Sequence, residues 1–197
     1  MNDNKRYTPT VRGVGFLGVG NHKAWVGGKI TPAYWAWGGM MKRCYGPSCS
    51  VRYPTYIDCT VAPEWHNFQV FAEWYHAQTI GEGWELDKDL IIKGNKVYSA
   101  ETCSFVPREI NTLLMNCKAS RGDLPQGVTR FRGRYKARIR VRGKQQHLGT
   151  FSTPEAAFEA YKGVKEAHVK DMANFWKPEL DPRVYATLMA YTVTADD

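Results

Sequence analysis

Polar and apolar residues alternate over the most regular stretch of this chain, from position 130 to position 142. Every even position there is basic, while the odd positions carry apolar, aromatic or small residues. The basic residues are Arg130, Arg132, Arg134, Lys136, Arg138, Arg140 and Arg142. Because successive side chains of a strand point to opposite faces, the pattern predicts a β-strand with one cationic face and one face packed on a core.

Helical patterns occur twice in the first half of the chain. Thr31 is a suitable N-cap and Pro32 fits the first helical position, so we expect a helix to begin there. Its expected apolar contacts are Tyr34, Trp35, Trp37, Met40 and Met41. A second helix is expected from Pro63, with a stripe of residues three to four positions apart that is more typical of a core than of a stacking platform. The stripe consists of Trp65, Phe68, Ala72 and Tyr75, widened by Phe71 and Trp74.

The remaining expected elements are shorter or less regular. Glycine-rich positions 1–30 predict an extended arm or irregular strands. The others, in chain order, are short strands at 86–92 and 96–98 around a Gly94-Asn95 turn, a helix at 108–114, a strand at 145–151, a helix from Thr153-Pro154-Glu155 and a last helix at 180–191.

A polar, turn-rich segment at 119–127 predicts a domain boundary. The expected organisation is an N-terminal arm (1–30), a first domain (31–118), a second domain (119–175) and a C-terminal helix and tail (176–197). The second domain combines a small sheet with one backing helix, and the predicted fold class is α+β.

The positive charge of the chain is concentrated in one segment. Positions 118–144 hold ten Lys or Arg residues and one acid, a local net charge of +9, whereas the whole chain has +8. The rest of the chain therefore sums to about −1, so the basicity belongs to one module. Such a concentration is typical of a nucleic-acid-binding surface. The alternative is a solvated basic face that keeps an edge strand from aggregating.

Composition adds limits on compartment and partners. The 43% of hydrophobic residues and the seven Trp are enough for real cores. No stretch approaches 18 uninterrupted apolar residues and no apolar run follows the first six residues, so we expect neither a membrane span nor a secretory signal. Five cysteines are an odd number for a disulfide scaffold, which favours a reducing cytoplasm.

Four motifs in the second domain occur in a familiar order. They are Gly127-Val128, the strand 133–140, Leu148-Gly149-Thr150-Phe151 and the helix start 153–161. Together they resemble an AP2/ERF DNA-binding domain, a family of plant transcription factors that also occurs in phage and mobile-element endonucleases. The resemblance covers roughly 127–173.

The AP2 resemblance implies a three-stranded antiparallel sheet in the major groove of double-stranded DNA, with one helix packed on its back. The residues that match family contact positions are Arg134, Tyr135, Arg138 and Arg140, and His147 falls where the family usually has Trp. Lys136 and Arg142 join them from the charge pattern, as do Arg130 and Arg132, which lie in a stretch one residue shorter than the plant pattern. Phosphate contacts would fix the register, and one or two Arg would read bases.

The segment 86–107 resembles the core of phage-borne HNH-like homing endonucleases, which carry an Asp-His pair followed by Gly-Asn-Lys. The upstream residues Trp37 to Tyr45 and Tyr53 to Trp74 are similar to the phage group in which such a core precedes an AP2 module. The resemblance implies a ββα-metal core, a location in the host cell cytoplasm if the protein is phage-borne, and Mg²⁺ or Mn²⁺ as the cofactor.

Roles for individual residues follow from the HNH resemblance. Asp87 takes the metal-ligand position, Asn95 matches the turn Asn, and Asp89 is a second carboxylate ligand or a base. Two residues depart from the family pattern: Lys88 stands where the family has its His base, and Thr102 where it has a second ligand. Without the family context, positions 87–89 would be interpreted as a solvated strand edge with a Lys-Asp pair.

The cysteines offer a competing metal. Cys44, Cys49, Cys59 and Cys103 would be the ligands of a structural zinc ion. The spacing is irregular and contains no Cys-x2-Cys pair, and buried free cysteine is common. A zinc site is therefore the weaker alternative to a magnesium or manganese site.

These patterns predict sequence-specific binding of double-stranded DNA with metal-dependent phosphodiester cleavage of the homing-endonuclease type. The alternative from another class is a catalytically inactive DNA-binding regulator on the same scaffold, which the absence of a His base favours. A third hypothesis is an RNA-binding protein.

Overall fold

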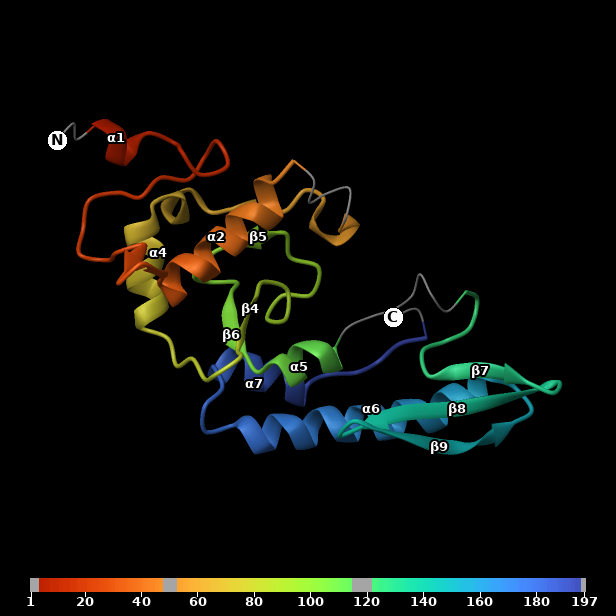
Figure 1. Cartoon of the computed structure of the whole chain (residues 1–197). Helices are drawn as coiled ribbons and strands as arrows, with labels where there is room; N and C mark the ends of the chain where they lie inside the picture. The colour runs from red at the N-terminus through yellow and green to blue at the C-terminus, as the bar shows by residue number, and fades with distance from the viewer. Residues whose placement is uncertain (1–3, 48–52, 115–121, 196–197) are drawn as a thin grey trace. The chain divides into compact units, whose positions relative to one another are not determined.

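The computed structural model describes residues 4–47, 53–114 and 122–195 of the chain. The chain divides into two compact units, Met1–Val106 and Pro107–Asp197, each with its own helices and strands (Figure 1). The mixed α and β composition confirms that part of the expected fold class. Among the described residues, no helix is both long and apolar enough to cross a membrane.

The first unit is built from short elements. They are α1 (Asn4–Tyr7), β1 (Trp25–Val26), β2 (Lys29–Ile30), α2 (Pro32–Tyr45), η1 (Pro54–Tyr56), β3 (Thr60–Val61), η2 (Pro63–His66), α4 (Phe68–His76), β4 (Glu85–Asp87), β5 (Val97–Tyr98) and β6 (Ser104–Val106). β1 pairs with β2 and β4 pairs with β6, both antiparallel, while β3 and β5 are parallel. The strand expected at 86–92 is wrong beyond Asp87, where β4 ends, and the strand expected at 96–98 forms as β5. These two strands do not pair with each other. A complete ββα-metal core in this unit stays a prediction.

Helix α2 begins where the sequence predicts. The hydroxyl of Thr31 accepts a hydrogen bond from the Tyr34 backbone N–H at 3.4 Å, which caps the helix. Four of its residues are buried, namely Ala33, Trp37, Met40 and Met41. The expected core contact of Trp35 is wrong, since its side chain is 69% exposed. Two residues before Trp37, it lies about 200° away around the helix axis and so on the opposite face.

The second expected helix is interrupted. Residues from Pro63 form the 3-10 turn η2, and α4 starts only at Phe68. Asn67 separates the two, because it leaves the helical conformation and its side-chain oxygen accepts from the Gln69 N–H at 3.0 Å. One continuous helix from Pro63 is therefore wrong, although both pieces keep the predicted apolar stripe.

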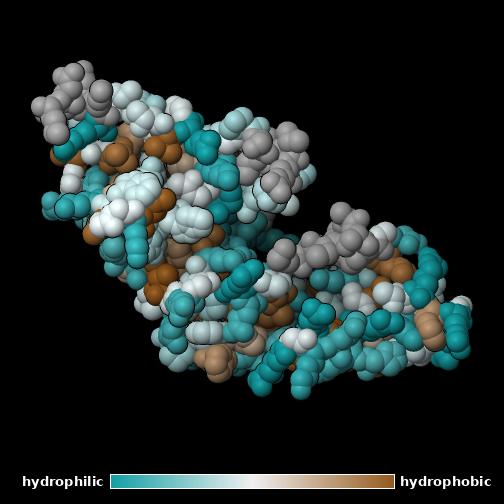
Figure 2. Space-filling model, viewed as in Figure 1, coloured by the Kyte–Doolittle hydropathy of each residue, from teal (hydrophilic) through white to brown (hydrophobic). Residues whose placement is uncertain are grey.

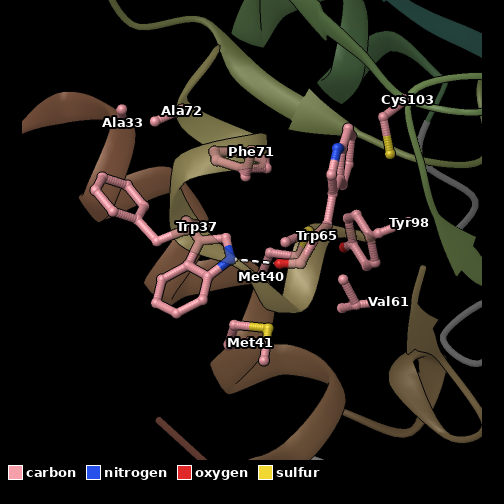
Figure 3. Packing of buried hydrophobic residues seen from close by; sticks show 11 residues of the cluster. Ala33, Trp37, Met40, Met41, Val61, Trp65, Phe71, Ala72, Tyr98 and Cys103 are labelled. Atoms are coloured by element: carbon pink, nitrogen blue, oxygen red, sulfur yellow. Dashed lines mark hydrogen bonds between the residues drawn. The ribbon is translucent and has the colours of Figure 1, made fainter. Parts of the chain in front are cut away.

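The core of the first unit lies between α2, α4 and the short strands, as the aromatic stripe predicts. Trp65 and Phe68 are buried, and Trp37 donates its indole N–H to the Trp65 carbonyl at 2.7 Å (Figure 3). That bond satisfies a polar group that would otherwise be buried without a partner. The remaining buried members are Ala33, Met40, Met41, Val61, Phe71, Ala72, Tyr98 and Cys103.

The second unit contains a sheet with one long helix on its back (Figure 1). Its elements are α5 (Arg108–Leu113), β7 (Val128–Phe131), β8 (Arg134–Val141), β9 (Lys144–Phe151), α6 (Pro154–Trp176) and α7 (Pro182–Met189). The sheet is antiparallel in the order β7-β8-β9. The hydroxyl of Thr153 accepts from the Ala156 N–H at 3.2 Å and caps α6. The three-stranded antiparallel sheet and the packed helix confirm this part of the expected fold.

The core between this sheet and α6 explains one glycine of the AP2-like motif. Gly127 has a positive φ of 79°, and a Cβ atom there would meet the ring of Tyr161 at 2.1 Å. Only glycine fits that approach without displacing the helix. The buried residues of this core are Val128, Ala137, Ile139, Ala157, Phe158, Tyr161 and Val193.

The division between the units lies at 106/107, before the boundary expected at 119. Helix α5 belongs to the second unit because α6 holds it by two hydrogen bonds. Lys165 donates its ammonium to the Leu113 carbonyl, and Trp176 donates its indole N–H to the Glu109 carboxylate. Both bonds join positions more than 50 residues apart. The turn-forming residues near 119, on which the expected boundary was based, therefore could not predict them.

Candidate nucleic-acid interface and the Asp87 loop

Two tight turns of the same kind connect the strands of the second unit. Arg132-Gly133 joins β7 to β8, and Arg142-Gly143 joins β8 to β9. In both turns φ is 49° at the arginine and 76° at the glycine. Positive φ at both central residues defines a type I′ turn, whose twist matches that of the flanking strands.

The first turn changes which cations share a face. Across the β7–β8 ladder Phe131 pairs with Arg134 and Arg130 pairs with Tyr135, and paired residues project from the same side of a sheet. Arg130 therefore lies on the side of Tyr135, opposite to Arg134. The expected single strand with seven cations on one face is wrong, because the turn at 132–133 interrupts it.

Four cations do form a row on β8. Ala137 and Ile139 are buried against α6, so the alternating residues Arg134, Lys136, Arg138 and Arg140 project from the other face. We call this surface, together with its β9 partners, the cation face. The partners are Thr150 opposite Lys136, His147 opposite Arg138 and Gln145 opposite Arg140.

Among the described residues, no carboxylate forms an ion pair with the four cations of the cation face. Arg134 donates to the Thr150 carbonyl at 3.2 Å, and the Lys136 ammonium lies 3.1 Å from the centre of the Phe131 ring. The strands β7, β8 and β9 contain no Asp or Glu, and the surface over them is mainly hydrophilic (Figure 2). A shallow open depression on the face is lined by Lys136, Arg138, Gln145 and His147.

The other predicted contact residues have different surroundings. The Arg130 guanidinium donates to the Asp123 carboxylate at 2.8 Å and lies 5.7 Å from the centre of the Tyr135 ring, which itself packs on the core. Arg132 and Arg142 are exposed at the two turns, at opposite ends of β8. Arg132 and Arg142 thus extend the positive charge beyond both ends of the row, and Arg130 and Tyr135 do not belong to it.

The Asp87 loop follows β4 in the first unit. One oxygen of Asp87 accepts the backbone N–H groups of Asp89 and Leu90, at 2.9 and 2.7 Å, so this carboxylate closes a turn. Burial, and then the charge of Asp89, raises the pKa of Asp87 above its ordinary value against these hydrogen bonds. The two predicted carboxylates therefore lie close enough to influence each other.

Asn95 has a structural role in this loop. Its amide nitrogen donates to the carbonyls of Lys88 and Val97, at 2.7 and 2.6 Å, and its oxygen accepts from the Val97 N–H at 3.2 Å. Thr102, which the HNH resemblance placed where a second ligand is expected, donates to the same Val97 carbonyl at 2.7 Å. These hydrogen bonds fix the loop between β4 and β5 and direct the Asn95 amide at backbone groups rather than at Asp87 or Asp89.

One cation pairs with a carboxylate of the loop, and a second, missed from the sequence, contacts the same tyrosine as the first. Lys88 is 6% exposed and its ammonium donates to Asp89 at 3.0 Å. Arg43, near the end of α2, donates to the Tyr98 hydroxyl at 3.0 Å, and the Lys88 ammonium lies 6.0 Å from the same ring. Arg43 is 45 positions before Lys88, so only the tertiary fold brings it to this loop.

The histidines and cysteines of the first unit lie in other settings. His66 contacts the Tyr45 hydroxyl and the Val61 carbonyl, and His76 stacks on His22. Burial raises the pKa of Cys44 and of Cys103 to about 12, so both are protonated thiols at neutral pH. Cys49 lies outside the described residues. Within 4–47, 53–114 and 122–195, no three His, Cys, Asp or Glu side chains are grouped as a metal site.

Comparison of this chain with protein-family models, with curated proteins and with solved structures found no match.

Proposed function

We propose that this protein binds double-stranded DNA through the cation face of its second unit. The single observation that supports this most is the row formed by Arg134, Lys136, Arg138 and Arg140, which faces away from the core and has no carboxylate on its strands. Like charges in a row repel one another, and an anionic partner removes that repulsion. The phosphates of nucleic acid provide a matching row of negative charges.

The form of the face suits a duplex. The major groove of B-form DNA admits a two-stranded β-ribbon, and α6 covers the other side of the sheet. Side chains on one face of a strand recur every ~6.8 Å, which equals about two base-pair steps along the DNA axis. Arginine can also read guanine with two hydrogen bonds, so this face can provide both phosphate contacts and base contacts.

Phosphodiester cleavage by the first unit is a second candidate function. The supporting observation is the pair Asp87 and Asp89 beside the buried ammonium of Lys88. One oxygen of each carboxylate lies outside the hydrogen bonds described above, and these two would hold Mg²⁺ or Mn²⁺ together with water. A bound cation would polarise the phosphate and stabilise the leaving oxygen. Asn95 does not fit as a third ligand, and Lys88 in place of a His base favours the alternative of an inactive DNA-binding regulator.

Competition between nucleic acids tests the proposed binding mode. Duplex DNA should compete for the labelled complex better than duplex RNA of the same sequence, because the deep, narrow major groove of A-form RNA excludes a β-sheet. The logarithm of affinity should also fall with the logarithm of salt concentration, with a slope of about −4 if four or five phosphates are contacted. Equal competition by RNA at moderate salt would contradict the DNA proposal and favour an RNA-binding protein.

A further inference from the structure

The first unit has a strongly uneven charge distribution along the chain. Positions 4–57 contain eight Lys or Arg residues and no Asp or Glu, whereas positions 58–106 contain three basic and eight acidic residues. The net charge outside the basic segment of the second unit is therefore near zero only because the acidic residues at 58–106 offset the basic residues at 4–57. Positions 4–57 form a second cationic region of the sequence. A stretch of 54 residues without a carboxylate favours an anionic partner over a protein surface of mixed charge.

An exposed apolar hairpin lies within this cationic region. β1 and β2 pair Trp25 with Ile30 and Val26 with Lys29, and all four side chains are exposed. The turn is Gly27-Gly28, with positive φ at both residues and open space around it. A two-stranded hairpin with no buried face adds little to folding stability. An exposed tryptophan at its edge is therefore better explained by contact with a partner.

The base of the hairpin is fixed while its tip is open. The Gln69 side chain of α4 forms two hydrogen bonds with the backbone of His22. It accepts from the His22 N–H at 3.0 Å and donates to the His22 carbonyl at 2.9 Å. Thr31 donates from its backbone N–H to the Ala24 carbonyl at 2.9 Å and then caps α2. The hairpin is thus held at the start of α2, where Trp35 is also exposed. Because its base is already held by these hydrogen bonds, the hairpin loses little conformational freedom when it binds a partner.

We propose that this hairpin and Trp35 form a second DNA-contacting surface, which binds duplex DNA outside the segment bound by the cation face. Trp25 and Trp35 would pack on bases or sugars, as apolar and aromatic wedges do in DNA grooves, and Lys23 and Lys29 would contact phosphates. Both lysines are exposed. The inference rests on the proposed function, because both surfaces bind the same duplex.

Binding to duplexes of two lengths tests this surface in the full chain. The eight-residue strand β8 spans about 27 Å, or about eight base pairs, so a duplex of about 12 base pairs accommodates the cation face alone. Trp25→Ala and Trp35→Ala should each weaken binding to a duplex of about 40 base pairs by about 10-fold and leave binding to the short duplex unchanged. The matched controls Phe175→Ala, with the same 69% exposure as Trp35, and Val70→Ala should bind both duplexes like wild type.

The outcomes separate this inference from the proposed function. If wild type binds the long duplex, Arg138→Ala weakens it and both Trp variants bind like wild type, the second surface is wrong and the cation face stands. If wild type binds no duplex DNA, both proposals fail. Trp-dependent binding to anionic lipid vesicles, with duplex affinity unaffected, would instead assign the hairpin to a membrane surface and overturn the inference. The side chains replaced in the Trp variants and their controls are exposed, that of Arg138 is half-buried, and circular dichroism checks that each variant is folded.

Discussion

Replacement of Arg138 by alanine should weaken the binding of a cognate duplex by about 1–3 kcal/mol and relax specificity at one base pair. Arg138 lies in the middle of β8, opposite His147 and at the depression of the cation face, so it is the best placed of the four cations to reach a base edge. Arg138→Lys keeps the charge but loses the two-pronged hydrogen bond. It should recover non-specific affinity and leave the specificity defect, as measured by fluorescence anisotropy on cognate and mutated sites.

Two other arginines control for the loss of a positive charge. Arg183 of α7 pairs with Asp181 at 2.7 Å, so Arg183→Ala should leave duplex affinity unchanged. Arg130→Ala should have a smaller effect than Arg138→Ala, because Arg130 lies on the opposite side of the sheet and pairs with Asp123. Equal losses for all three variants would mean that only total charge matters, which contradicts a specific cation face.

Asp87→Asn should abolish metal-dependent cleavage while duplex binding stays within about twofold, if the first unit is a nuclease whose affinity comes from the second unit. Asparagine keeps the oxygen that accepts from Asp89 and Leu90, removes the charge, and replaces the other oxygen, the proposed metal ligand, with an NH2 group. The measurement is nicking of supercoiled plasmid and of target DNA with Mg²⁺, Mn²⁺ or chelator. Asp58→Asn is the control, since Asp58 is exposed outside the loop and asparagine tolerates its positive φ of 64°.

The pH dependence of cleavage gives an independent readout of Asp87. A metal ligand or base must be ionised, so activity is present above the pKa of the carboxyl and lost as pH falls through it. Burial raises the pKa of Asp87 in the metal-free chain, so at low metal concentration the loss should begin at a higher pH than for an ordinary aspartate, whose pKa is about 3.9. Saturating Mg²⁺ or Mn²⁺ should move the loss to lower pH, because a bound cation favours the ionised carboxylate. If wild type binds a defined duplex tightly and nicks no substrate with any metal, the protein is a DNA-binding regulator and the enzyme proposal is wrong.

Local patterns predicted much of the second unit. The alternation along β8 placed four cations opposite Ala137 and Ile139, and Thr153 marked the start of α6. The position of Arg130 on the opposite side of the sheet from Arg134 was harder to predict. It depends on a type I′ turn at 132–133, and arginine at the first position of such a turn is less typical than asparagine or aspartate. The similar sequences Arg132-Gly133 and Arg142-Gly143 could still have indicated two equivalent turns.

The first unit was harder to predict because its pairings are distant in sequence. Thr60 pairs with Val97 and Asp87 pairs with Ser104, and no local residue selects these partners. By contrast, the exposure of Trp35 follows from helix geometry once Trp37 is assigned to the core. The hydrogen bonds of Asn95 also agree with local chemistry, since asparagine in a turn often bonds to the backbone two residues on.

The most direct measurement for the central claim is an NMR titration with duplex DNA that follows the arginine side-chain Nε–H signals. The cation face predicts that the signals of Arg134, Arg138 and Arg140 shift and saturate together, while that of Arg183, paired with Asp181, stays in place. Binding of the duplex without shifts at Arg138 and Arg140 would contradict the cation face as the DNA-binding surface.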